Sequence, residues 1–229
     1  MYIKGNLPVL LVAHLDTVHK KIPNEFWFNL ERTKIMASEG IGGDDRCGVF
    51  ILNKFISSNY HPHILFTTDE ETGCYGAQQF CDDFNNIDVN CIIEVDRRGF
   101  NDVISYEDEN EDLTKIFEKL GFKHSYGTFT DISILSPHFG ISGVNLSCGY
   151  YNPHTNEEYV VLDEILNTYY KIIEFFKSET NYSTKFLYKS TPFIYQNIYS
   201  RQVGAHMCEC CLKKIGNYDE FYLTPDGYL

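Results

Sequence analysis

Three features are scarce or missing in this sequence of 229 residues: basic side chains, long apolar runs and paired cysteines. Lys and Arg together number 19 against 32 Asp and Glu, which gives a formal net charge of −13. A surface of this sign repels the phosphate backbone, so we expect no nucleic-acid partner. No apolar stretch is long enough to span a bilayer, and residues 7–12 run directly into His14. We therefore expect no membrane partner either.

The eight cysteines do not form the pattern of a disulfide framework. Cys47, Cys74, Cys81, Cys91 and Cys148 stand singly among apolar residues. This is the pattern of reduced thiols in a core. A cytoplasmic location is therefore expected.

Hydrophobic residues make up 43% of the chain, and short apolar runs alternate with amphipathic stretches. We expect strands over 8–13, 64–68, 91–95 and 141–148, a hairpin within 22–41, and helices over 45–57, 77–84, 111–120 and 157–177. This alternation predicts an α/β fold with a mostly parallel or mixed sheet sandwiched by helices. Residues 1–180 are expected to form the catalytic domain. Residues 181–229 differ in composition and are expected to form a small, Cys-rich C-terminal appendage.

Acidic and histidine-bearing segments cluster where the predicted strands end, which is where open α/β sheets place their sites. They are AHLDTV at 13–18, GGDDRCGV at 42–49, TDEETG at 68–73, EVDRRG at 94–99 and YNPHTNEEY at 151–159. Together they supply two histidines, a candidate bridging carboxylate and several further carboxylates. That is the ligand set of a two-metal hydrolase.

In this order the segments resemble those of the co-catalytic zinc exopeptidases, which include peptidase T and other M20 enzymes and the M28 and M42 aminopeptidases. The resemblance covers roughly residues 7–175. Between Asp96 and His154 there is no room for the M20 lid domain. Between His14 and Asp44 there is no room for the M42 barrel domain. The chain thus looks like a stripped catalytic core, most similar to the M28 layout.

The resemblance implies a centre of two Zn²⁺ ions, or of Co²⁺ or Mn²⁺ in their place. Its implied ligands are His14 and Asp96 for one ion, Glu71 and His154 for the other, and Asp44 as the bridge. The implied catalytic residues are Glu70, the general acid/base, and Asp16, which accepts the ring N–H of His14 and fixes its tautomer. The peptide bond after the bridging aspartate is often cis in this superfamily.

Two of these ligands have competitors in the sequence. Glu94 lies two residues before Asp96 on the same strand face, although the strand-end position favours Asp96. His138 and His124 compete with His154, which the Asn-Pro-His-Thr context favours. The histidines at positions 19, 61 and 63 are expected to be ordinary surface residues.

Three further residues are candidates for substrate binding. Arg97 could receive a substrate carboxylate, although a solvated charge is the ordinary reading. Asp131 falls where M28 and M42 enzymes carry a similar Thr/Ser-Asp loop, and could grip a free amine. Tyr151 could donate to an oxyanion, although packing is the default role for such a tyrosine.

The C-terminal segment carries a second candidate zinc site, formed by His206, Cys208 and Cys211. The Cys-x-x-Cys spacing resembles the first half of a zinc ribbon, but the second cysteine pair is missing. One copy of the chain therefore cannot close a four-cysteine site. A tail with free thiols is the alternative.

The resemblance implies a zinc-dependent hydrolase of amide bonds in short peptides. The leading expectation is an aminopeptidase that uses a metal-bridging hydroxide, with Glu70 as general acid/base. An N-acyl amino-acid deacylase or dipeptidase of M20 type stays open, as does an inactive binding or scaffold homologue. A sheet edge left uncovered near the N-terminus would favour a homo-oligomer.

Overall fold

The computed structural model describes residues 1–190 and, in the C-terminal segment, 206–207, 214–215, 223–224 and 227–228. The chain divides into two compact units, Met1–Lys189 and Ser190–Leu229. In the second unit, strand β12 (His206–Met207) pairs antiparallel with β13 (Lys214–Ile215), and β14 (Leu223–Thr224) pairs with β15 (Gly227–Tyr228). Cys208 and Cys211 of the candidate tail site lie outside the described residues.

A seven-stranded sheet runs through the first unit in the order β1-β5-β2-β6-β9-β7-β8. Its strands are β1 (Tyr2–Ile3), β2 (Leu7–His14), β5 (Pro62–Thr67), β6 (Cys91–Arg97), β7 (Asp102–Ile104), β8 (Lys123–His124) and β9 (Gly143–Ser147). The four strands β5, β2, β6 and β9 are parallel. Strand β1 runs antiparallel to β5, and β7 runs antiparallel to β9 but parallel to β8. The expected α/β fold with a mixed sheet is confirmed.

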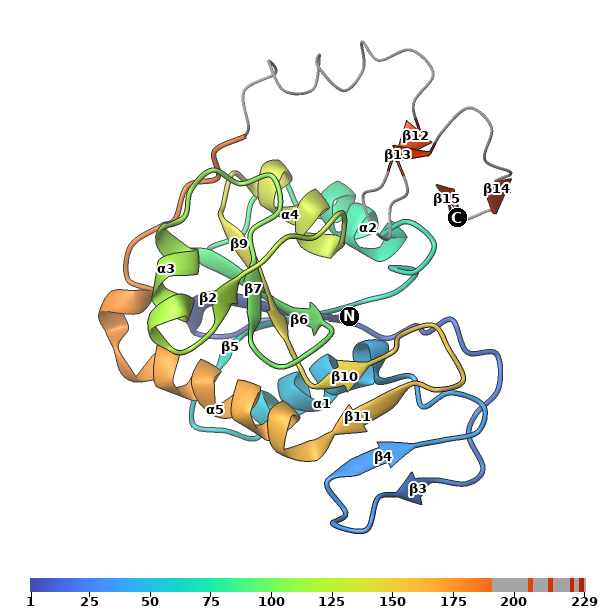
Figure 1. Ribbon diagram of the computed structural model, residues 1–229. Coiled ribbons are helices and arrows are strands. Elements are labelled where there is room, and N and C mark those ends of the chain that lie inside the picture. Colours follow the sequence, from blue (N-terminus) through green and yellow to red (C-terminus); the bar gives the residue numbers. More distant parts are fainter. Residues whose placement is uncertain (191–205, 208–213, 216–222, 225–226, 229) are drawn as a thin grey trace. The chain divides into compact units, whose positions relative to one another are not determined.

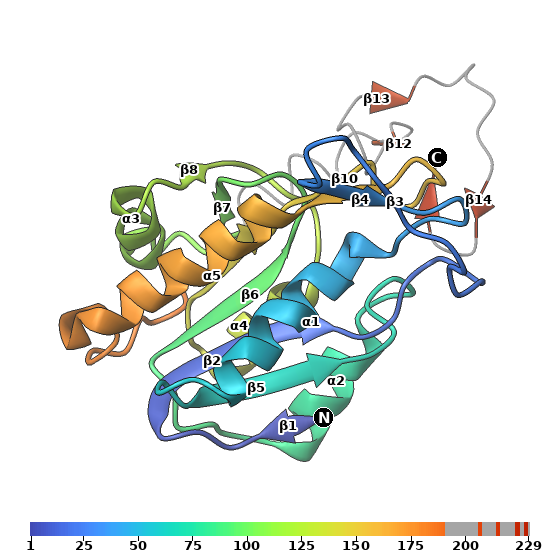
Figure 2. The ribbon, with the colours of Figure 1, turned by 90° about the horizontal axis from the view of Figure 1, so that it is seen from below.

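Helices cover both faces of this sheet (Figure 1). One face carries α1 (Gly43–Ile56), α3 (Asp112–Lys119) and α5 (Leu162–Lys177), and the other carries α2 (Tyr75–Asp83) and α4 (Asp131–Phe139). Figure 2 shows α1 and α5 lying across the strands on their shared face. A short 3₁₀ helix, Glu179–Asn181, follows α5. Residues after it stay in this unit, where Leu187 forms a β-bridge with Ile141.

The central strand β2 shows how the sequence builds two cores. Val9, Leu11 and Ala13 belong to the core beneath α1 and α5, whereas Leu10 and Val12 belong to the core beneath α2 and α4. Successive side chains of a strand point to opposite faces, so an unbroken apolar run fills both layers. All five are 0% exposed. This explains why β2 reads as a continuous apolar run that stops at the polar end of the sheet.

A second, four-stranded sheet lies beside the first in the order β10-β11-β4-β3, and all its pairings are antiparallel. Its strands are β3 (Trp27–Phe28), β4 (Lys34–Met36), β10 (Tyr150–Tyr151) and β11 (Tyr159–Val161). The expected hairpin within 22–41 is its β3–β4 pair. The expected helix start at 157 was wrong: residues 159–161 form β11, and α5 begins at Leu162. The run Tyr-Val-Val is aromatic and β-branched, which suits a strand.

Helix α4 was not expected from the sequence, because Pro137 interrupts its helical pattern. Its start is nevertheless capped: the Thr130 side chain accepts from the backbone of Ser133, whose hydroxyl in turn accepts from the N–H of Thr130. Gly140 closes the helix in the left-handed conformation. The capping box and the terminal glycine both favour a helix over 131–139, although Pro137 lies inside it.

Three expectations concern the chain as a whole: membrane spans, the state of the cysteines and oligomer formation. In the described part of the chain, no helix has the length and apolar character needed to cross a membrane. The five scattered cysteines are free and buried. Strand β1 lies at the edge of the sheet, and homo-oligomer formation stays a prediction.

The aromatic contact between α3 and α5 offers a direct test of this core. Phe117 is 0% exposed and stacks on Phe175, with ring centroids 5.1 Å apart. Phe117→Ala is expected to lower the free energy of unfolding by about 3–5 kcal/mol, because it removes buried area and leaves a cavity. Urea denaturation measures the change. Phe50→Ala, on a ring that is 47% exposed, is the control and should cost far less. Equal losses for both variants would contradict the packing described.

Candidate active site

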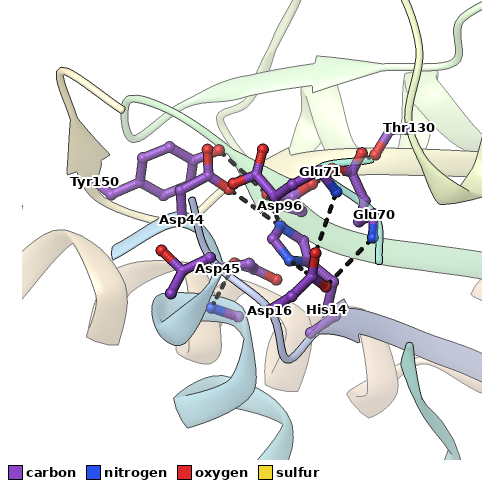
Figure 3. A network of polar contacts seen from close by, with 12 residues as sticks. His14, Asp16, Asp44, Asp45, Glu70, Glu71, Asp96, Thr130 and Tyr150 are labelled. Carbon is purple, nitrogen blue, oxygen red and sulfur yellow. Dashed lines mark hydrogen bonds and ion pairs between the residues drawn. The ribbon is translucent and has the colours of Figure 1, made fainter. Parts of the chain in front are cut away.

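The carboxyl ends of three neighbouring parallel strands, β5, β2 and β6, carry the polar side chains that form one cluster (Figure 3). His14 is the last residue of β2, and Thr67, its partner in register, ends β5 just before Glu70 and Glu71. Asp96 stands near the end of β6, on the other side of β2. The parallel register therefore brings together side chains that are far apart in the sequence.

Asp44 occupies the centre of this cluster, at the start of α1. Its Oδ1 lies 3.1 Å from Nε2 of His14, and its Oδ2 lies 3.2 Å from Nε2 of His154. The two oxygens of one carboxylate thus face two different imidazoles. The Asp44–Asp45 peptide bond is cis, as the resemblance implied. Asp45 turns away from the cluster and accepts the backbone N–H of Gly48 at 2.9 Å.

Each histidine has a further carboxylate beside it. Nε2 of His14 lies 3.6 Å from Oδ1 of Asp96, and Nε2 of His154 lies 2.9 Å from Oε2 of Glu71. Two sets of donor atoms each converge within 4.8 Å: those of His14, Glu70 and Asp96, and those of His14, Asp44 and Glu71. The second oxygen of Glu71 is buried without a hydrogen-bond partner. Nitrogen and carboxylate donors around an unpartnered oxygen fit divalent metal ions.

Asp16 lies behind His14, on the side away from this cluster. Its Oδ1 is 3.3 Å from Nδ1 of His14, and its two oxygens accept the backbone N–H groups of Glu70 and Glu71, each at 3.3 Å. One carboxylate therefore orients the imidazole and also fixes the segment that carries both glutamates. The dashed contacts in Figure 3 show this arrangement.

Asp96 is held by neighbours that the sequence reading missed. The hydroxyl of Tyr150 donates to its Oδ1 at 3.2 Å, and the hydroxyl of Thr130 lies 3.4 Å from its Oδ2. The amide of Asn145 donates to its carbonyl and accepts its N–H, both at 2.9 Å. A buried asparagine inside the apolar run 141–148 was the available signal, since such an amide needs partners.

The cluster concentrates negative charge in a buried place. Burial, together with the charge of Asp96, raises the pKa of Glu70 to about 9. Burial and the charge of Asp44 raise the pKa of Asp96 to about 7. Hydrogen bonds to Asp44 and Glu71 raise the pKa of His154 to about 10. Burial opposes protonation of His14, but its carboxylate neighbours still raise its pKa far above the usual range. Such a site favours cations.

The family profile of peptidase family M28 matches residues 3–133, which is more than half of the chain. The chain belongs to peptidase family M28. The resemblance seen in the sequence is thereby confirmed, and this M28 chain is a peptide hydrolase by family. Comparison with curated proteins gave no match.

Solved structures share the fold of this M28 peptidase. A tripeptidase from Staphylococcus aureus subsp. aureus Mu50 is 16% identical with a TM-score of 0.61, over 76% of this chain and 82% of that one. Aminopeptidase PepT from Bacillus cereus is 14% identical with a TM-score of 0.57, over 75% and 82%. LapB from Legionella pneumophila is 16% identical with a TM-score of 0.52, over 76% and 52%. At these identities the likeness concerns the fold alone.

The residues of this M28 chain that competed for the ligand positions, Glu94 against Asp96 and His138 against His154, lie apart from Asp44 at the cluster's centre. Glu94 is 0% exposed and accepts the hydroxyl of Thr130 at 2.8 Å, whereas Asp96 reaches His14. His138 contacts the carbonyl of Phe84 at 3.0 Å, on the outer side of α4.

The other competing histidine, His124, lies on the exposed strand β8. The expectation of three ordinary surface histidines was wrong for two of them. The His19 side chain is 7% exposed beside Glu158, and His63 is buried with its ring bonded to Tyr2. His61 is exposed.

The three candidate substrate-binding residues of this M28 peptidase all have protein partners. The Nε of Arg97 lies 3.6 Å from Asp102, and its Nη2 donates to the carbonyl of Tyr126 at 3.3 Å. Tyr151 donates to Glu164 at 2.7 Å. Asp131 is 0% exposed and accepts the hydroxyl of Thr67, and burial raises its pKa.

Proposed function

We propose that this M28 peptidase is an aminopeptidase of short peptides that works with two divalent metal ions, zinc in the first place. The observation that carries the proposal is the position of Asp44, whose two oxygens lie 3.1 and 3.2 Å from the imidazoles of His14 and His154. A carboxylate shared between two nitrogen donors is the arrangement that a bridging ligand requires.

The remaining ligands follow from the same contacts. Asp96 completes the pair with His14, and Glu71 completes the pair with His154. Zinc held by these side chains would act as a Lewis acid on the scissile carbonyl and lower the pKa of water towards neutrality. Asp16 keeps the His14 ring oriented throughout, because it contacts the nitrogen opposite the metal side.

Glu70 is the proposed general acid/base. Its carboxylate lies beside the His14 and Asp96 donors, while its backbone N–H is fixed by Asp16. From there it takes a proton from the attacking water and returns it to the leaving amine. Glu71 points to His154 instead, so the two adjacent glutamates serve different roles.

An unblocked peptide is the proposed substrate class. Asp16 and Glu70 carry negative charge beyond that of the three ligand carboxylates, and this charge would attract the ammonium group of a free N-terminus. Of the solved structures that share this fold, one is named an aminopeptidase and another a tripeptidase. N-acyl amino acids lack the ammonium group and would lose this attraction.

Removal of the metal is the direct test. The chain treated with a chelator and dialysed is expected to lose hydrolysis of aminoacyl p-nitroanilides, and Zn²⁺, Co²⁺ or Mn²⁺ should restore it. Metal analysis of the restored protein should find two ions per chain. Full activity in the metal-free chain would end the proposal. N-acetylated substrates serve as the control: their preferential cleavage would point to a deacylase.

A further inference from the structure

A fully buried carboxylate that is absent from the proposed ligand set lies next to the Asp44 loop. Glu158 is 0% exposed and precedes β11. It stands at the end of the 152–158 loop, which also carries His154. Burying a charged carboxylate costs several kcal/mol unless hydrogen bonds satisfy it.

The Glu158 carboxylate accepts hydrogen bonds from the segment that leads to Asp44. Its Oε1 accepts the backbone N–H of Asp44 at 3.0 Å, and its Oε2 accepts that of Gly42 at 2.8 Å. Nε2 of His19 lies 2.7 Å from the same Oε2. Because a carboxylate only accepts, this nitrogen carries the proton in the contact. Three donors therefore satisfy one buried charge.

Glycines allow these close approaches. A Cβ on Gly43 would lie 2.6 Å from Val160 and 3.3 Å from the Glu158 carboxylate. Gly40 has φ of +84°, and a Cβ there would lie 2.0 Å from the His19 ring. The glycines ahead of Asp44 therefore let Glu158 and His19 reach the backbone. This gives Gly40 and Gly43 a physical reason beyond the start of a helix.

We propose that Glu158 is a positioning residue for the metal centre, an inference that rests on the proposed function. It ties the Asp44 backbone to the loop that carries His154, and so sets the separation at which one carboxylate faces both imidazoles. Glu158 touches no proposed ligand side chain and no reacting atom, so its effect passes through Asp44. Partners of this kind typically change metal affinity by 10–100-fold when they are removed.

Zinc affinity tests the proposal without any need for peptidase activity. Wild type, Glu158→Gln and Glu157→Gln are titrated with Zn²⁺ in competition with a chromogenic chelator. Glu157 is the exposed neighbour in the same loop and serves as the matched control. Glu158→Gln is expected to bind zinc about 10–100-fold more weakly, and Glu157→Gln as wild type does. Excess zinc should restore kcat/KM of Glu158→Gln towards the wild-type value.

A purely structural role would give a different result. Metal-free thermal unfolding of Glu158→Gln would then shift to lower temperature while its zinc affinity stayed at the wild-type value, which overturns the proposal. If Glu158→Gln does not fold, His19→Ala removes one donor and should weaken zinc binding to a smaller degree; unchanged affinity there also overturns it. A wild-type chain that binds no zinc overturns the proposed function together with this inference.

Discussion

Glu70→Gln is expected to lower kcat for peptide hydrolysis by about 10²–10⁴-fold while the chain keeps its full zinc content. The substitution preserves the size of the side chain but removes the group that takes and returns the proton. Because Glu70 is not among the proposed ligands, metal analysis should give the same stoichiometry as for wild type. Steady-state kinetics on an aminoacyl p-nitroanilide and metal analysis of the same preparation provide both measurements.

Two other outcomes of this experiment are informative. Near-normal kcat would show that another group moves the proton. Loss of zinc would instead make Glu70 a ligand, which the convergence of its carboxylate with His14 and Asp96 allows. Glu118→Gln, on the exposed side of α3, is the control and should change neither quantity.

Asp44→Ala is expected to reduce bound zinc from two ions to at most one and to abolish hydrolysis. Asp44 contacts both histidines, so its loss removes a ligand from each ion at once. We expect the remaining zinc affinity to fall by more than about 100-fold, beyond the loss typical of an outer partner. Equilibrium dialysis followed by metal analysis measures this.

The control for the Asp44 substitution is Asp82→Ala. Asp82 lies exposed on α2, so its replacement removes the same charge at a distance from the cluster. The Asp82→Ala chain should bind two zinc ions and keep wild-type activity. Two zinc ions bound to Asp44→Ala would show that this carboxylate does not bridge, and the metal assignment would have to be rebuilt.

Much of the site could be predicted because its residues end apolar runs. The run of β2 fills both cores and stops at His14, and β5 ends just before Glu70. An apolar run predicts a strand, and the polar residues that follow its carboxyl end are then candidates for the site. Parallel register then brings these ends together. The resemblance to the zinc exopeptidases named the five proposed ligands, and the structure brings their side chains into one cluster.

Contacts across long sequence separations were harder to predict. His19 lies in a polar stretch with no periodic pattern, and its partner Glu158 is 139 residues away. Glu94 and Asp96 share a strand face in the sequence pattern. The pairing of β6 with β9 shifts register between Glu94 and Arg97. Asp96 reaches Nε2 of His14 at 3.6 Å, whereas Glu94 accepts the hydroxyl of Thr130, which also lies near Asp96. No local rule reports such a shift, because it depends on the neighbouring strand.

The pairing of β4 with β11 has a consequence for the newly made chain. The segment that carries Asp44 follows β4, and the loop that carries His154 precedes β11. Strands β4 and β11 must therefore pair before the Asp44 carboxylate can lie between the imidazoles of His14 and His154. Ribosomal synthesis delivers β11 long after β4, and pairings this distant form late. The nascent polypeptide is thus expected to have no peptidase activity until β11 has been synthesised and has paired with β4.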